Sequence, residues 1–165
     1  MSEFGRGSIH SVASTWSYRH ANLAVTRHGS NDVRAIRGDR PVPEVATWVA
    51  AQPEELLFTT AVCQAEILAG IQILPDGQRR RVLQAAARAI FADDFDGRIL
   101  PFDQTVAGLY AELFAARRRA GRPTTTADLM IAAVARANGA SMVTRDISGF
   151  EGCGLTLINP WVKPP

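Results

Sequence analysis

The stretch TTTADLMIAAVARANGASMVTRDISGF, residues 124–150, contains a helix, a turn and a strand in unbroken order. The Thr run can cap a helix that is apolar almost all round, and Asn138-Gly139 can end it. ASMVTRD then has the length and composition of a short buried strand. A buried helix that leads directly into a buried strand is typical of an α/β domain. Two acids, Asp128 and Asp146, lie in this apolar setting, and their presence there requires an explanation.

The same alternation of helices and short strands extends over most of the chain. Helices are predicted over 43–52, 61–74, 79–95, 104–121 and 124–139, and strands over 55–60, 97–103, 140–146 and 155–161. Short apolar strands separated by helices predict an α/β domain with a mainly parallel sheet. A chain of 165 residues is long enough to bury one core of this kind.

Residues 1–30 form an atypical N-terminal segment, and the folded domain is predicted over residues 31–165. The segment shows no sustained helical or strand period, and NLAVT (22–26) is its one strand-like run. Three origins stay open for it: a disordered or unusual extension, residues left by expression cloning, or a mis-called start. It therefore does not enter the prediction of the fold.

The composition narrows the class of protein. Hydrophobic residues make up 47% and charged residues 21%, which is ordinary for a globular protein and excludes a disordered one. No apolar run is long enough to span a bilayer and no secretory signal is visible, so we expect a cytoplasmic protein without membrane contact. Cys63 and Cys153 have no metal-ligand spacing and are expected to be free thiols. The net charge of +2 does not by itself predict nucleic-acid binding.

Glu66 is the first acid in an unexpected position. Its neighbours three and four residues away on the predicted helix are apolar or small: Val62, Cys63, Ala69 and Gly70. A carboxylate on an apolar stripe is costly unless a cation or hydrogen-bond donors meet it. The alternative is a Glu at an exposed helix edge, or one paired with an arginine.

Asp128 and Asp146 also allow two interpretations each. Asp128 can stabilise the first turn of its helix, whose N-terminus we expect to be buried, and Asp146 can form a turn. However, Asp146 follows a strand at its carboxyl end, where α/β sheets bind ligands. With Glu66 they make an all-oxygen set, the kind that selects Mg²⁺ or Mn²⁺, and His10, His20 and His28 all lie in the N-terminal stretch. The chemistry indicated is hydrolysis of a phosphate ester.

Five motifs in order, TTAVCQAEILAGI, ILPFDQTVAGLYAEL, TTTADLMIAAVA, TRDISGF and LINPW, resemble those of PIN-domain proteins, specifically VapC-type toxins of the FitB-like branch. The resemblance implies a three-layer α/β/α PIN-like domain with a mainly parallel central sheet. It also implies a toxin of a type II toxin–antitoxin pair that cuts RNA with Mg²⁺, for which Mn²⁺ can substitute. The implied partners are a second copy of the chain and a small antitoxin, through which alone the complex would contact operator DNA.

The resemblance assigns roles to particular residues. Glu66, Asp128 and Asp146 match three of the family's four metal-binding acids and are therefore the expected catalytic residues. Thr144 matches the Ser/Thr of the family's site, and Arg145 is expected to contact the RNA backbone. Arg122 is a further candidate for the backbone contact, although solvation at the surface explains it better.

The fourth acid departs from the family's pattern. The family's Asp-x-Asn falls on Gly29-Ser30-Asn31, so Gly29 stands where the aspartate belongs, and Asp32 is the nearest acid that could replace it as a metal ligand. Three alternatives stay open: a disturbed reading frame or start, a degenerate toxin that folds and binds antitoxin, or a shifted strand that brings Asp32 into the site. Three functions stay open: an RNA-cutting nuclease, a non-catalytic module that binds an antitoxin, and a DNA-directed phosphohydrolase.

Overall fold

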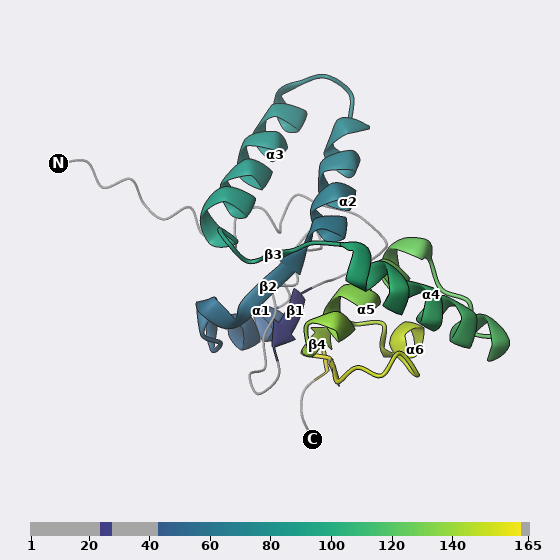
Figure 1. The fold of residues 1–165 in the computed structure, drawn as a ribbon. Coiled ribbons are helices and arrows are strands. Elements are labelled where there is room, and N and C mark those ends of the chain that lie inside the picture. The colour runs from purple at the N-terminus through teal and green to yellow at the C-terminus, as the bar shows by residue number, and fades with distance from the viewer. Residues whose placement is uncertain (1–23, 28–42, 163–165) are drawn as a thin grey trace.

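The computed structural model describes residues 24–27 and 43–162, which form a small sheet with helices around it (Figure 1). The strands are β1 (Ala24–Arg27), β2 (Leu57–Thr60), β3 (Ile99–Leu100), β4 (Ala140–Val143) and β5 (Leu157–Ile158). The helices are α1 (Pro43–Ala50), α2 (Ala61–Gln72), α3 (Gln78–Ala89), α4 (Gln104–Arg119), α5 (Thr126–Ala137) and α6 (Ile147–Phe150), with a 3-10 turn (Glu54–Leu56) and a π-helical turn (Ile90–Asp94). Every helix and strand predicted within these residues is confirmed to within a few positions. The short helix α6 and the π-helical turn were not predicted.

The sheet has the strand order β3-β2-β1-β4-β5. The outer pairs, β2 with β3 and β4 with β5, are parallel. The central strand β1 is antiparallel to both neighbours, with Val25 opposite Phe58 on β2 and opposite Met142 on β4. Four of the five strands therefore run in the same direction, which confirms a mainly parallel sheet. The strand-like run NLAVT, which did not enter the prediction of the fold, contributes the central strand β1, and its reversed direction was not predicted.

Helices cover both faces of the sheet. Met142 and Val143 are consecutive on β4 and point to opposite faces, as alternate residues of a strand do. Met142 packs into a core cluster with Leu113 of α4 and Ile131 of α5. Val143 packs on the other side against Trp48 of α1. The order helix, sheet, helix confirms the predicted α/β/α layers.

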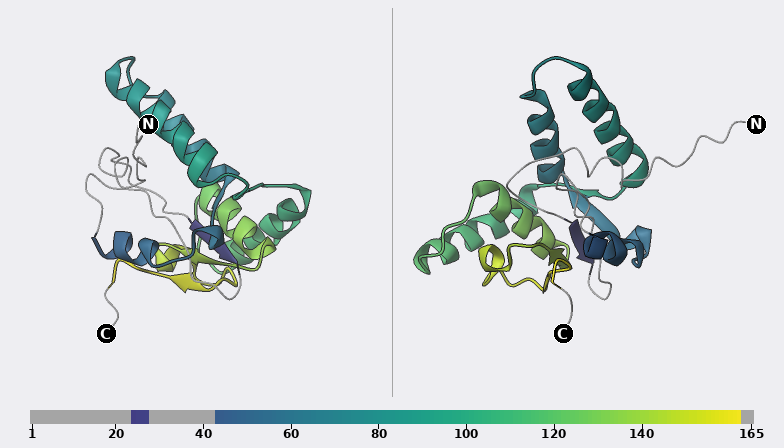
Figure 2. Two further views of the ribbon diagram at one scale, coloured as in Figure 1. Left: turned by 90° about the vertical axis from the view of Figure 1, so that its left-hand side faces the viewer. Right: turned by 180° about the vertical axis from the view of Figure 1, so that it is seen from behind.

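The hairpin of α2 and α3 projects from the rest of the molecule, as all views in Figures 1 and 2 show. It has a hydrophobic cluster of its own, which joins the two helices to the sheet through Leu57 of β2. The buried members of this cluster are Leu57, Ile71, Leu83, Ala87, Ile90, Phe91 and Phe95. The hairpin is therefore held by a second, smaller core that lies apart from the one around α5.

Side-chain caps and glycines fix where the helices begin and end. Thr60, Asp103 and Thr125 each accept a hydrogen bond from a backbone N–H in the first turn of α2, α4 and α5. Gly121 and Gly139 follow α4 and α5 with φ of 65° and 59°, a conformation that glycine adopts without strain. These boundaries agree with those predicted.

Both cysteines are buried free thiols, as predicted. Burial raises the pKa of the Cys153 thiol, although the positive charge of Arg117, which lies 3.8 Å from the sulfur, opposes that rise. The thiol is therefore neutral at physiological pH and behaves as a small apolar side chain. Of the helices in residues 43–162, none combines the length and the apolar character that crossing a bilayer would require.

The hairpin core makes a testable contribution to stability. Leu83 is 3% exposed, so Leu83→Ala leaves a cavity and is expected to lower the free energy of unfolding by about 2–5 kcal/mol in urea denaturation. Val82 is the adjacent residue and is 53% exposed, so Val82→Ala is the matched control and should change stability by less than about 0.5 kcal/mol. Equal losses in the two variants would show that the hairpin is not packed as described.

Candidate functional site

The carboxyl ends of β2 and β4 lie at the same edge of the sheet. Val25 is opposite both Phe58 and Met142, so the residues that follow these two, Thr59 and Val143, occupy corresponding positions. This edge is where open α/β sheets bind ligands. Each of the three predicted acids belongs to an element that begins there: α2, α5 or the turn after β4.

Glu66 lies on α2, which begins at this edge directly after Thr60. Its side chain is half-buried, with Cys63 and Gly70 buried beside it and Ala69 exposed. The predicted apolar stripe is therefore incomplete, because its member Ala69 faces solvent. Glu66 therefore stands at the boundary between the buried and exposed sides of α2. The helices α2 and α5 contact each other.

Asp128 lies in the first turn of α5 and interacts twice with Thr125. The backbone N–H of Asp128 donates to Thr125 Oγ1 at 3.1 Å, and the same hydroxyl donates to Asp128 Oδ2 at 2.5 Å. The prediction of a buried helix N-terminus was wrong, since Thr125 and Thr126 are exposed and Asp128 is half-buried. Burial begins with the next residue, Leu129. The carboxylate is thus held at the end of a rigid, buried helix but stays within reach of solvent.

Asp146 follows β4 and is exposed. Its Oδ1 accepts hydrogen bonds from Gly149 N–H and Ser148 Oγ, both at 2.9 Å, so it caps α6. Its own N–H donates to Thr144 Oγ1 at 3.0 Å. A Cβ at position 149 would lie 2.2 Å from Asp146 Oδ2, so only glycine leaves the carboxylate where it is. The turn-forming interpretation is correct, and the turn holds the carboxylate at the carboxyl-terminal edge of the sheet.

The predicted substrate-binding residues differ in their exposure to solvent. Thr144 is 2% exposed, and its hydroxyl orients the Asp146 backbone. Arg145 is exposed beside it. Arg122 is 59% exposed and lies 3.3 Å from the carboxylate of Glu151. Asp32, predicted as the replacement metal ligand, lies outside the described residues, as do Gly29 and Asn31.

The carboxylates have the chemistry of a hard divalent-metal site, but they are not gathered as one. Among residues 24–27 and 43–162, no three His, Cys, Asp or Glu side chains are close enough together to hold an ion. The central strand runs in the opposite direction to β4, since β1 ends at Arg27, opposite Ala140 at the start of β4. The carboxyl end of β1 is thus at the edge of the sheet away from Asp146.

Two residues that hold Asp146 were missed by the sequence prediction, Ser148 and Gly149. The spacing Asp-x-Ser-Gly at the start of a short helix is a signal that could have found them, because an aspartate at a helix N-cap accepts from groups two and three residues later. Both lie in the motif TRDISGF, where only the aspartate and the two residues before it had been given roles.

The sequence is similar to one protein family and to individual relatives. A PIN-domain family profile matches residues 33–151. The chain is 42% identical over 121 residues to plasmid stability protein StbB of Pseudomonas syringae pv. tomato, covering 73% of this chain and 87% of that protein. It is 39% identical over 132 residues to VapC ribonuclease Y4jK of Sinorhizobium fredii, covering 80% of this chain and 94% of that protein.

The fold was compared with solved structures. The structure of FitAB bound to an IR36 DNA fragment matches with a TM-score of 0.70 and 31% identity, covering 76% of this chain and 90% of that one. The sequence and structure comparisons therefore agree on the same family. The matches cover 87–94% of the length of each of these proteins.

The interactions between Thr125 and Asp128 yield a prediction about stability. Thr125→Ala removes the N-cap of α5 and should lower the free energy of unfolding by about 1 kcal/mol, measured by urea denaturation. Thr125→Ser is the matched control, because it keeps the hydroxyl and should lose much less. A serine variant as unstable as the alanine variant would contradict the capping role.

Proposed function

We propose that this chain, which belongs to the PIN-domain family, is the toxin of a type II toxin–antitoxin pair and hydrolyses RNA phosphodiester bonds with Mg²⁺ or Mn²⁺. The observation that carries the proposal is its 39% identity, over 80% of its length, to a protein named VapC ribonuclease. Three acids on elements that start at one edge of the sheet agree with that chemistry, since hard oxygen ligands prefer these ions.

Glu66, Asp128 and Asp146 are the residues proposed to hold the metal, with Asp32 as a further candidate. When bound, a divalent ion would supply an activated water and neutralise charge on the scissile phosphate. The three acids are not assembled into a ligand set in the structure, so binding requires their side chains to move together. Glu66 and Asp128 are half-buried and Asp146 is exposed, so solvent and ions can reach all three.

The residues around these acids orient them. Thr125 holds Asp128 through both its backbone and its carboxylate. Thr144, Ser148 and Gly149 each form one hydrogen bond with Asp146. Arg145, which is exposed beside Asp146, is proposed to contact the RNA backbone as a phosphate-binding cation. Thr144 is proposed to position Asp146 and not to contact the RNA, because it is buried and its hydroxyl accepts a hydrogen bond from the Asp146 backbone.

The proposed partners are a small antitoxin, a second copy of the chain and the RNA substrate. The likeness to a solved FitAB complex on DNA supports an antitoxin partner, because that neighbour is a two-component assembly. Operator DNA would be bound only through the antitoxin.

A second function is favoured by two specific observations. The described acids do not form a ligand set, and the position of the family's first acid is occupied by Gly29. A catalytically degenerate PIN-like module that dimerises and binds an antitoxin would have both features. Such a module needs no Mg²⁺ or Mn²⁺, so metal dependence separates the two functions.

RNA cleavage tests the proposal. The purified chain should cut single-stranded RNA with Mn²⁺ or Mg²⁺ and not with EDTA. Asp128→Asn keeps the shape of the side chain and removes its charge, so the rate should fall by at least about 10- to 100-fold. Asp76→Asn is the matched control: Asp76 is 94% exposed, pairs with Arg80 at 2.5 Å and lies in the turn between α2 and α3.

The control variant should cleave at the parent rate. A folded parent chain that cuts no RNA in any divalent ion would support the degenerate module instead. Cleavage of DNA and not of RNA would point to a different phosphohydrolase.

A further inference from the structure

Three aromatic residues and an arginine form a continuous row along α4. Phe102 and Tyr110 meet edge to face, with ring centroids 6.0 Å apart. Tyr110 and Phe114 are stacked, with centroids 6.1 Å apart and planes 26° from parallel. The Arg118 guanidinium lies over the Phe114 ring, 5.9 Å from its centroid. We call these four residues the α4 ladder.

The outer part of the ladder is not part of the core. The core side of α4 is formed by Val106, Leu113 and Arg117, which are all buried. Phe114 is 44% exposed even though Tyr110 and Arg118 contact it. Contacts between side chains four apart stabilise a helix by only a few tenths of a kcal/mol. That gain does not by itself account for a large aromatic ring placed in water next to a cation.

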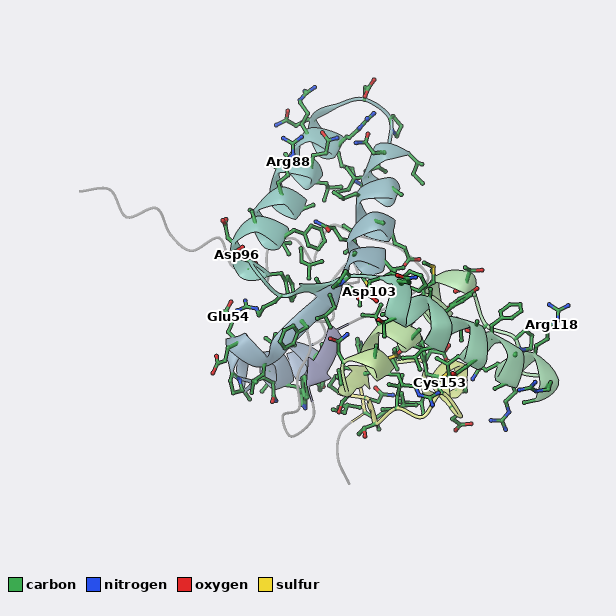
Figure 3. All side chains as sticks on the ribbon, in the orientation of Figure 1. Glu54, Arg88, Asp96, Asp103, Arg118 and Cys153 are labelled. Carbon is green, nitrogen blue, oxygen red and sulfur yellow. The ribbon has the colours of Figure 1, made fainter. Side chains whose placement is uncertain are left out.

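The ladder starts at the edge of the sheet that carries the acids. Phe102 comes just after β3, which is parallel to β2 with Leu100 opposite Thr60. From there α4 runs outward, so that Asp103 lies near the sheet and Arg118 at the outer end of the helix, as Figure 3 shows. The helix packs along α5, whose first turn holds Asp128.

The charge is positive at the outer end of this path, whereas Asp103 and Glu112 lie nearer its start. Residues 113–127 contain four arginines and no acid, and the next residue is Asp128. Arg118 and Arg119 are exposed at the end of α4, and Arg122 is more than half exposed in the loop that follows. Such a surface suits single-stranded nucleic acid, because aromatic rings stack on bases and guanidinium groups bind phosphates. The surface also leads to the acids.

We propose that the α4 ladder is a stacking platform for the bases of single-stranded RNA next to the cleavage site, with Phe114 as its central ring and the arginines around it as phosphate contacts. The inference rests on the proposed function, because it names how that same substrate is held. The platform contributes to affinity and tolerates different sequences, since every base has a face that can stack.

The test is the affinity of the full chain for a short fluorescein-labelled single-stranded RNA of mixed sequence, measured by anisotropy in EDTA, with cleavage in Mn²⁺ measured in parallel. Phe114→Leu keeps an apolar side chain and removes the ring, and should raise Kd by about 5- to 100-fold. Phe114→Trp restores a ring and should bind as tightly as the parent. Ile73→Ala, at an apolar residue that is 75% exposed on the α2–α3 hairpin, is the control and should leave Kd unchanged.

Three results would overturn the platform. If the parent cuts RNA and Phe114→Leu binds RNA as tightly as the parent, the ladder only stabilises its helix, and the proposed function stands. If Phe114→Leu instead changes the chain from dimer to monomer in sedimentation, a second copy of the chain covers the ladder. If the parent neither binds nor cuts RNA, the proposed function and the platform fail together.

Discussion

The burial of α5 between the sheet and α4 is the constraint on which the other features depend. Residues 131–135 are all 0% exposed, and three of these five are alanines, which let α4 and β4 approach the helix closely. Because α5 leads through a tight turn at Gly139 directly into β4, this packing fixes both ends of the unit. Asp128 is held at the start of the helix and Asp146 just past the end of the strand. A rigid core thus positions two carboxylates that themselves contribute little to it.

The elements around α5 could be predicted because several local signals agreed. The Thr run, the all-round apolar helix and the Asn-Gly ending pointed to one helix, and the short apolar run after them pointed to one strand. The direction of β1 could not be predicted in this way. AVTR is four residues long, and its side-chain alternation is the same for a parallel and an antiparallel strand. Only the path of the chain on either side of a strand decides its direction.

The residue types of the candidate site could be predicted from the sequence, but the positions of their side chains could not. The sequence identified Glu66, Asp128 and Asp146 as acids in unusual surroundings, and all three belong to elements that start at the carboxyl-terminal edge of the sheet, where open α/β sheets bind ligands. It could not show that Asp146 caps α6, because that depends on the turn formed by Ser148 and Gly149. Nor could it show that Glu66 stands at a boundary, because a helical wheel does not reveal whether Ala69 is exposed.

The central claim is that these three acids form one divalent-metal site once an ion is present. Titration of the metal-free chain with Mn²⁺, followed by the loss of the free-ion electron paramagnetic resonance signal, tests it without any substrate. We expect saturable binding that weakens at least about 10-fold in Glu66→Gln, because each carboxylate contributes to the same ion. A chain that binds no Mn²⁺, or a Glu66→Gln variant with the parent's affinity, would contradict it.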